Sequence, residues 1–517
     1  MTAPAAIRLM GDFRISTQLH TQVVLPAGAG PHPVLLVRTP YSTSSHMAEA
    51  FSWAAKGVGS VIQDVRGRYE SGGRWQPYVN EGLDGCDTLA WIKQQPWSDG
   101  RVIAYGSSYG AHCAVELARL AGDHLWGVVV TVPALSLAHT IREPSGVPRL
   151  FAHAWWWSSQ GDQSTTRGPI LDALLRHRPD VLRHLPVAEL PESLGVDLPG
   201  FADAWETSRD GWTAPGMTSS GRVNTRVSVP PLIVLAGLYD VYCDDAVELW
   251  RQWPNESARL LINTWQHDLG LKHRDRNGAR PRQRAHQIPA VAALLGWVMR
   301  VLDGEAPAGR VGLSAVESCQ QWRSVPPTEQ GQTHLELSVH RSDFVADPSD
   351  PHPSAMGPAE VGDLMARSDC ALLTTDPFLE DLDLIGTLTV ELGQVHAALP
   401  DGVQLDWAIR VIECRSNGKS VQLGHGIIRT ADRTNLRISI PRVSQRVRFG
   451  SHLAVQVSGH QFPLYPRDGQ RGEDALRVSE LHPLTRSVEA PAHIRVCIAT
   501  GTASDLTVDE LIGELLK

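Results

Sequence analysis

The protein has 517 residues, of which 42% are hydrophobic and 20% are charged, and its formal net charge is −9. This composition is typical of a globular protein and excludes an intrinsically disordered one, and the length predicts about three domains. No basic run with interleaved aromatic residues occurs in the sequence, so we expect no nucleic-acid partner.

The cysteines and the N-terminal residues indicate the compartment. Seven cysteines are scattered along the chain without a CxxC pair, which predicts neither a zinc site nor a disulfide framework. Unpaired thiols in a reducing compartment are the simplest interpretation. The N-terminal residues lack the pattern of a signal peptide, and no apolar run is long enough to span a membrane. We therefore expect a cytoplasmic protein without a membrane partner.

The first third of the chain predicts an α/β domain. Four short apolar runs are typical of strands that are buried on both faces; they cover residues 33–38, 60–65, 101–105 and 127–132. Between them, residues 87–95 and 111–120 predict helices. Because strands that alternate with helices pair in parallel, we expect a parallel sheet.

An insertion interrupts this pattern at residues 139–225. It contains three consecutive tryptophans within FAHAWWW (151–157), followed by stretches rich in histidine and arginine and by several prolines. The α/β pattern resumes with apolar runs at 231–237 and 259–263, and a helix is expected at about 285–302. The insertion therefore reads as a segment that lies over the α/β domain.

Beyond Gly309 the hydrophobic period changes to two. Alternating runs of this kind are typical of half-buried strands; they occur at 335–339, 388–392, 405–412, 436–440, 453–457 and 494–498. Glycine, proline and aspartate turns separate them. This pattern predicts an antiparallel β-sandwich.

A candidate nucleophile lies between the strand at 101–105 and the helix at 111–120. Residues 106–110 read GSSYG, a G-x-S-x-G motif in the strand–turn–helix setting that a nucleophile elbow requires. The sharp turn would project the hydroxyl of Ser108, and the small glycines would relieve crowding of the backbone. The N–H of Tyr109 would then point to the position where an oxyanion forms.

An acid and a base follow in the order of the α/β-hydrolases. Asp240 comes directly after the strand at 231–237, and His267 comes after the strand at 259–263. Each would lie at the carboxyl end of a late strand. His267 would take the Ser108 proton and return it to the leaving group, while Asp240 would hold the imidazole in the required tautomer.

Other residues compete for these roles. His273 is close to His267 in sequence and is the alternative base, whereas His112 and His139 come too early for a late-strand position. Asp244 and Asp245 follow Asp240 but fall within an expected helix, where they would cap the first turn. We expect Cys113, one turn along the elbow helix, to be a packing residue.

Several motifs together resemble one family. They are RTPY at 38–41, DVRGR at 64–68, SGG at 71–73, QPWSDGRV at 95–102, GSSYG at 106–110, GLYD at 237–240, DPFLEDL at 376–382 and GHGIIR at 424–429. Spread over nearly the whole chain, they resemble the cocaine esterase and X-Pro dipeptidyl-peptidase (CocE/NonD) group of α/β-hydrolases.

The resemblance implies three parts: a catalytic α/β-hydrolase domain at 1–138 and 226–308, a helical cap at 139–225 and a C-terminal antiparallel β jelly roll at 309–517. It also implies that Tyr41 donates its hydroxyl to the oxyanion hole beside the Tyr109 amide. Residues 64–67 would be structural, with their arginine tying loops near the site. This chemistry requires no metal or organic cofactor.

The resemblance also limits the substrate. Relatives that hydrolyse amino-acid esters carry an acidic pair two and three residues after the catalytic aspartate, but Tyr242 and Cys243 stand there in this chain. This lowers the expectation of a substrate with a free α-amino group. Trp155, Trp156 and Trp157 are candidate pocket walls, although packing within the cap is the interpretation that we favour.

The sequence thus predicts a serine hydrolase that acts on a small-molecule carboxylic ester or amide through an acyl-enzyme. Three alternatives stay open: an acyltransferase or release enzyme with a different acceptor, an X-Pro dipeptidyl aminopeptidase, and a non-catalytic binding protein. The sequence leaves the oligomeric state open, so a homodimer is neither predicted nor excluded.

Overall fold

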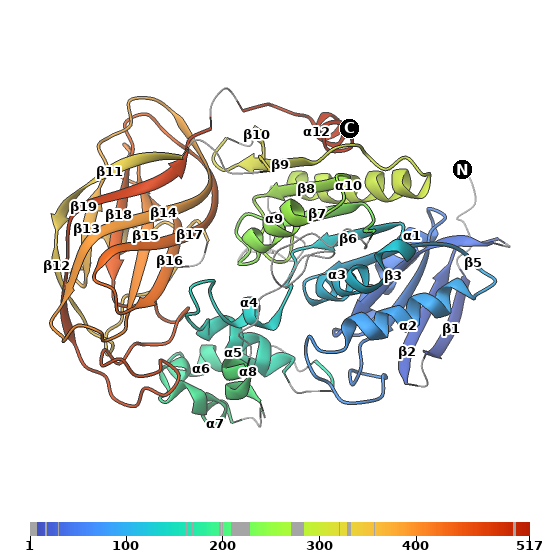
Figure 1. Cartoon of the computed structure of the whole chain (residues 1–517), viewed down its shortest axis with the longest axis horizontal. Coiled ribbons are helices and arrows are strands. Elements are labelled where there is room, and N and C mark those ends of the chain that lie inside the picture. Colours follow the sequence, from blue (N-terminus) through green and yellow to red (C-terminus); the bar gives the residue numbers. More distant parts are fainter. Residues whose placement is uncertain are drawn as a thin grey trace.

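The structure is a computed structural model. It describes residues 8–15, 18–28, 30–161, 164–166, 170–195, 198, 200–207, 228–269, 284–319, 321–327, 332–355, 357–499 and 503–517. Figure 1 shows three regions: an α/β region in blue and green, an antiparallel β region in yellow to red, and short teal helices beside both.

The α/β region is built on a ten-stranded sheet in the order β1-β2-β4-β3-β5-β6-β7-β8-β9-β10. The strands from β4 to β9 in this order are parallel, and antiparallel pairs close both edges. The bounds are β1 Arg8–Ile15, β2 Leu19–Leu25, β3 His32–Thr39, β4 Gly59–Asp64, β5 Ser98–Ser107, β6 Gly127–Thr131, β7 Leu232–Gly237, β8 Ala258–Asn263, β9 Val311–Val316 and β10 Gln321–Ser324.

Helices cover both faces of this sheet, which explains the continuous apolar runs of its central strands. In β3, Val34 and Leu36 face one core while Leu35 and Val37 face the other, as the period of two requires. The first core is covered by α2 Glu81–Lys93, α3 Tyr109–Ala121 and α9 Cys243–Gln252. The second is covered by α1 Met47–Ala54, α10 Arg284–Leu302 and α12 Val508–Leu515.

The described part of the segment between β6 and β7 is helical; we refer to it as the cap, and its role as a cap domain at 139–225 stays a prediction. Its helices are α4 Leu137–Ile141, α5 Leu150–Ser159, α6 Ile170–His177, α7 Leu190–Leu194 and α8 Phe201–Thr207. The fully buried Trp205 and Phe201 pack with Leu150 of α5 in a shared core. This core also contains Tyr109 of α3, so the cap rests on the helix that follows the candidate nucleophile.

The β region is entirely antiparallel, with the order β16-β15-β18-β13-β11-β19-β14-β17 and β12 paired to β19. Side chains of β14, β15 and β17 meet in one core, so the sheet folds over on itself. The bounds are β11 Gln332–Arg341, β12 Asp343–Ala346, α11 Gly362–Met365, β13 Cys370–Thr374, β14 Leu382–Ala397, β15 Leu405–Cys414, β16 Ser420–Thr430, β17 Thr434–Val447, β18 His452–Ser458 and β19 Leu484–Cys497. Its jelly-roll connectivity stays a prediction.

Three elements within the predicted range 309–517 pack with the α/β region instead. Strands β9 and β10 extend the ten-stranded sheet, and α12 packs on α10 through Leu511 and Leu515 (Figure 1). The change of period at Gly309 indicated strands, but a period of two does not indicate which sheet a strand joins.

Candidate active site

Ser108 occupies the sharp turn between β5 and α3. Its backbone has φ 55° and ψ −121°, a left-handed conformation that side chains rarely adopt. A β-carbon on Gly106 would lie 1.9 Å from the carbonyl oxygen of Gly110. The two glycines therefore allow the strand and the helix to approach closely enough to project Ser108.

Asp240 and His267 lie in two loops that are hydrogen-bonded to each other just beyond the carboxyl ends of β7 and β8. The strands are parallel, with Gly237 opposite Asn263. The loops continue this pairing, because the N–H of Tyr239 donates to the carbonyl of Trp265 at 3.0 Å. A β-carbon on Gly237 would lie 2.5 Å from that carbonyl oxygen. This close contact between the two loops fixes the separation of the acid and the imidazole.

These three side chains form a continuous line. His267 Nε2 lies 2.9 Å from Ser108 Oγ, and His267 Nδ1 lies 3.1 Å from each carboxylate oxygen of Asp240. The carboxylate side chain is 1% exposed and the imidazole 44%. An acid shielded from water and a base open to it suit a group that exchanges protons with a substrate.

The competing residues have other partners. His112 is buried, its Nδ1 lies 2.7 Å from the carbonyl of Leu135, and burial lowers its pKa. His139 bonds Asp245 at 2.8 Å, and this hydrogen bond raises the pKa of the imidazole. His273, the alternative base, lies outside the described residues.

The remaining competitors make structural contacts. Asp244 and Asp245 lie in the first turn of α9, as predicted, and the carboxylate of Asp244 accepts a hydrogen bond from the backbone N–H of Arg442 at 3.2 Å. Cys113 is buried and its thiol lies 3.7 Å from a carboxylate oxygen of Glu81.

Tyr41, placed in the oxyanion hole by the resemblance, lies just after β3 and reaches the nucleophile. Its hydroxyl lies close enough to the side chains of Ser108 and Trp156 to interact with both, and burial raises the pKa of the phenol. The phenol therefore stays protonated at neutral pH and is able to donate.

Tyr109 is the first residue of α3. An N–H in the first turn of a helix has no acceptor within that helix, so the Tyr109 amide is suited to bind an anion. Its side chain turns away: the hydroxyl donates to Glu81 Oε1 at 2.7 Å and accepts from the N–H of Tyr78 at 2.7 Å.

The three tryptophans of α5 lie in different surroundings. Trp156 reaches Tyr41 and stacks on Tyr109, with ring centroids 6.5 Å apart and planes within 9°. Trp157 is buried against His153 in the cap. Trp155 is 42% exposed on the cap surface. Of the three candidate walls, only Trp156 is placed beside the nucleophile.

Sequence reasoning missed further residues around the site. The ring of Tyr242 lies 5.4 Å from that of His267, with the two planes at 62°. Its hydroxyl is close enough to Thr140 to interact with that side chain, and the hydroxyl of Thr140 lies 3.2 Å from the hydroxyl of Tyr78. The only signal for Tyr242 was its position two residues after Asp240; the sequence held no signal for the other two.

The arginine expected to tie the loops is a different one from that in residues 64–67. Arg66 donates to Asp84 of α2. Two residues further on, Arg68 donates from Nε to the carbonyl of Pro40 at 2.8 Å, next to Tyr41. The backbone turn at Gly67 sends the two guanidinium groups in different directions.

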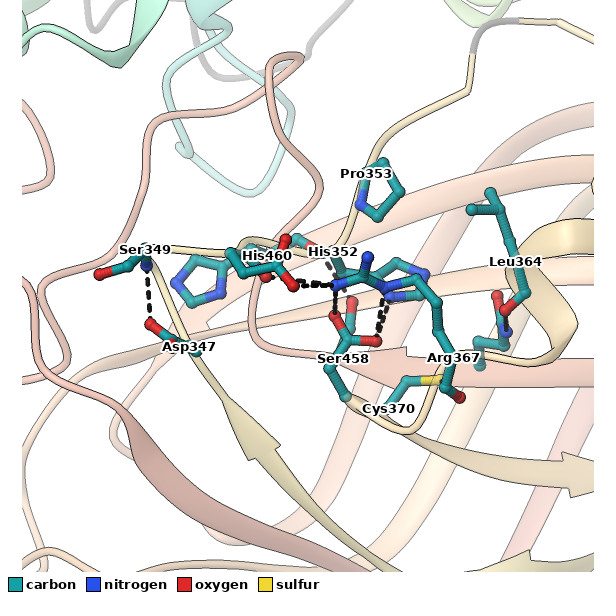
Figure 2. Close-up of polar contacts among 12 residues, drawn as sticks. Asp347, Ser349, His352, Pro353, Leu364, Arg367, Cys370, Ser458 and His460 are labelled. Atoms are coloured by element: carbon teal, nitrogen blue, oxygen red, sulfur yellow. Dashed lines mark hydrogen bonds and ion pairs between the residues drawn. The ribbon is translucent and has the colours of Figure 1, made fainter.

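Two clusters in the described β region bring potential metal ligands together. In the first, His352, Asp369 and Cys370 lie close to one another. Figure 2 labels His352, Cys370 and the nearby Arg367. His352 Nδ1 is 3.0 Å from Asp369, and Arg367 donates to both carboxylate oxygens at 2.9 and 2.7 Å. His352 Nε2 lies 3.0 Å from Arg410. Because two guanidinium groups already engage these atoms, we interpret the cluster as a structural network.

In the second cluster, His334, Glu391 and His493 lie on neighbouring strands. One oxygen of Glu391 lies 2.6 Å from His493 Nε2. The other faces Arg437 and Arg495 at 3.2 and 3.8 Å. A divalent cation would have to compete with both guanidinium groups for this carboxylate, so we assign no metal here.

The comparisons with known proteins agree with this architecture. A model of the X-Pro dipeptidyl-peptidases of the S15 family matches residues 16–268, and a model of the C-terminal non-catalytic domain of X-Pro dipeptidyl-peptidases matches residues 295–502. The chain belongs to this S15 family. It is therefore a serine hydrolase of the esterase and peptidase kind. Within the described ranges no helix is both long enough and apolar enough to cross a membrane.

Individual known proteins align with this chain over almost their whole length. The cocaine esterase of Rhodococcus sp. (strain MB1 Bresler) is 24% identical, with 95% of this chain and 97% of the esterase covered. An aminopeptidase from a marine sediment Thaumarchaeota archaeon and an α-amino acid ester hydrolase each have a TM-score of 0.72, at 19% and 18% identity. Each alignment covers 96% of this chain and 97% of the other. The predicted α/β-hydrolase fold class is confirmed.

Proposed function

We propose that the protein cleaves carboxylic esters or amides through an acyl-enzyme on Ser108. The serine oxygen attacks the carbonyl carbon while His267 Nε2 takes its proton, and the imidazolium then protonates the leaving group. Asp240 holds Nδ1–H and stabilises the imidazolium charge. A water molecule, deprotonated by the same imidazole, releases the acid. The observation that carries this proposal is the line of contacts at 3.1 and 2.9 Å.

The tetrahedral intermediate would place its oxyanion between the Tyr41 hydroxyl and the Tyr109 N–H. Each such donor commonly contributes about 3 kcal/mol to the transition state. The contact between Tyr41 and Ser108 and the raised pKa of the phenol support this role. A phenol that stays neutral can donate without itself carrying a negative charge beside the oxyanion.

The preferred acyl group would be uncharged and apolar or aromatic. Aromatic side chains lie near the nucleophile: Trp156 contacts Tyr41 and Tyr78, and Tyr242 packs on His267. Asp244 and Asp245 engage Arg442 and His139, so neither resembles a carboxylate held ready for a substrate ammonium. The name of the Rhodococcus relative, cocaine esterase, supports an ester rather than a peptide as the substrate.

A panel of substrates tests the proposal. Purified protein is incubated with p-nitrophenyl acetate, butyrate and benzoate, with aminoacyl p-nitroanilides and with X-Pro p-nitroanilides, and Ser108→Ala serves as the control. We expect rates above this control on the esters and stoichiometric labelling of Ser108 by a fluorophosphonate. Turnover confined to X-Pro anilides would identify a dipeptidyl-peptidase instead.

Two further outcomes distinguish the remaining alternatives. If an added amine or alcohol accelerated release of p-nitrophenol and captured the acyl group, the protein would be an acyltransferase. A folded protein whose Ser108 is inert to the fluorophosphonate would contradict catalysis altogether and favour a binding role.

A further inference from the structure

Arg68 joins the loop that carries Tyr41 to the cap. Its side chain is fully buried. Nε donates to the carbonyl of Pro40 at 2.8 Å, while Nη2 donates to the side-chain oxygens of Gln160 and Thr166 at 2.7 and 2.9 Å. One planar group thus spans two segments that are about a hundred positions apart in sequence.

Neighbouring contacts hold this junction in place. The N–H of Tyr69 donates to the carbonyl of Ser164 at 2.6 Å, and the indole N–H of Trp75 donates to the carbonyl of Gly161. The guanidinium carbon of Arg68 lies 5.4 Å from the ring centroid of Trp75, within range of a cation–π contact. The loop after β4 is therefore attached to the cap at several points around Arg68.

We propose that Arg68 is a positioning residue that sets the hydroxyl of Tyr41 against the reacting centre and couples this position to the cap. The inference rests on the proposed function. The peptide carbonyl that Arg68 holds belongs to Pro40, the residue directly before Tyr41. A shift of that carbonyl moves the α-carbon of Tyr41, and with it the phenol.

The charge of Arg68 also makes the Tyr41 hydroxyl a better hydrogen-bond donor. It opposes the increase in the pKa of Tyr41 that burial causes. A less basic phenolate corresponds to a more acidic O–H, which is a stronger donor to an oxyanion. Arg68 therefore improves the donor by position and by field, without touching the substrate.

An arginine is required because one rigid, planar guanidinium group has to hold Pro40 and the cap residues Gln160 and Thr166 at the same time. Lysine would keep the charge but would offer a single ammonium on a flexible stem, which cannot hold Pro40 and the cap in one fixed geometry. Arg66 is the matched control: it belongs to the same motif, its side chain is 35% exposed, and it pairs with Asp84.

The test is a double-mutant cycle on the full chain with the best ester of the panel. Arg68→Lys should lower kcat roughly 10- to 100-fold, the range that a misplacement of about 1 Å produces, and should change KM much less. Arg66→Lys should leave kcat within about twofold. In a Tyr41→Phe background, Arg68→Lys should have almost no further effect, because the hydroxyl that it positions is gone.

Equal losses from Arg68→Lys in both backgrounds would overturn the inference, as would a variant that keeps wild-type kcat. If Arg68→Lys does not fold, Thr166→Val removes one cap contact of the guanidinium, and its loss of kcat must likewise vanish in the Tyr41→Phe background. Fluorophosphonate labelling of wild-type Ser108 separates the two proposals: without labelling the proposed function fails, whereas labelling with an unaffected Arg68→Lys variant refutes only the positioning role.

Discussion

A β-carbon on Gly106 should disrupt the elbow on which the site is built. That atom would lie 1.9 Å from the carbonyl oxygen and 2.1 Å from the carbonyl carbon of Gly110. Non-bonded heavy atoms ordinarily approach to about 3.5 Å, so the start of α3 would have to retreat by roughly 1.5 Å. Overpacking a well-packed region costs about 1–3 kcal/mol. Because both sides of this contact are backbone, we expect a loss near 3 kcal/mol.

The same displacement should reduce reactivity, since Ser108 lies at the start of that helix. A shift of about 1 Å commonly costs about a hundredfold in rate. The assays are urea denaturation, which gives the free energy of unfolding, and the rate constant for fluorophosphonate labelling. We expect both quantities to fall in Gly106→Ala.

Two other glycines calibrate the result. A β-carbon on Gly110 would lie 3.2 Å from the carbonyl oxygen of Arg38, and one on Gly362 would have no neighbour within 4 Å. The loss of stability should therefore decrease from Gly106→Ala to Gly110→Ala and be close to zero for Gly362→Ala. A Gly106→Ala variant with wild-type stability and labelling rate would refute the steric reasoning.

Two further predictions concern the candidate active site, and a third concerns a buried carboxyl group of the β region. Asp240→Asn should leave stability nearly unchanged but lower kcat by roughly 10⁴-fold in steady-state ester hydrolysis, because an amide N–H forces the wrong tautomer on His267; a loss below tenfold would contradict the assigned acid. Tyr41→Phe should lower kcat by about a hundredfold without a comparable change in KM, and an unchanged kcat would remove Tyr41 from the oxyanion hole. Burial and the neighbouring Asp468 raise the pKa of Asp406 to about 7. Its contribution to the free energy of unfolding should therefore be lost as pH rises through 7. Urea denaturation at pH 5.5 and 8 should show a smaller pH dependence of this free energy in Asp406→Asn than in the wild type, and an equal dependence would contradict the raised pKa.

The residues that sequence reasoning brought together share one property: each follows a strand of the parallel sheet. Ser108, Asp240 and His267 lie directly beyond β5, β7 and β8, and the carboxyl ends of parallel strands meet at one edge of a sheet. Apolar runs located these strands, so the proximity of the three side chains followed from topology. Their catalytic roles stay predictions until the kinetics are measured.

Residues that approach from the cap or from irregular loops gave no such signal. Tyr78 and Thr140 meet through their hydroxyls although neither belongs to a strand. Their contact depends on how the cap packs on α3, which a local pattern does not encode. Arg68 was missed for a similar reason: the turn at Gly67 decides which arginine of the motif faces the cap.

The position of α12 constrains how the β region can move. The polypeptide enters this region from β10, a strand of the large sheet, and afterwards returns to cover α10 with Leu511 and Leu515. The chain therefore connects the two regions twice, once after β10 and once before α12. Two such connections oppose free rotation of the β region about a single hinge. A fragment that begins at residue 309 would remove β9 and β10 from the edge of the large sheet and α12 from its core. To isolate the β region, the chain has to be cut after β10 and before α12.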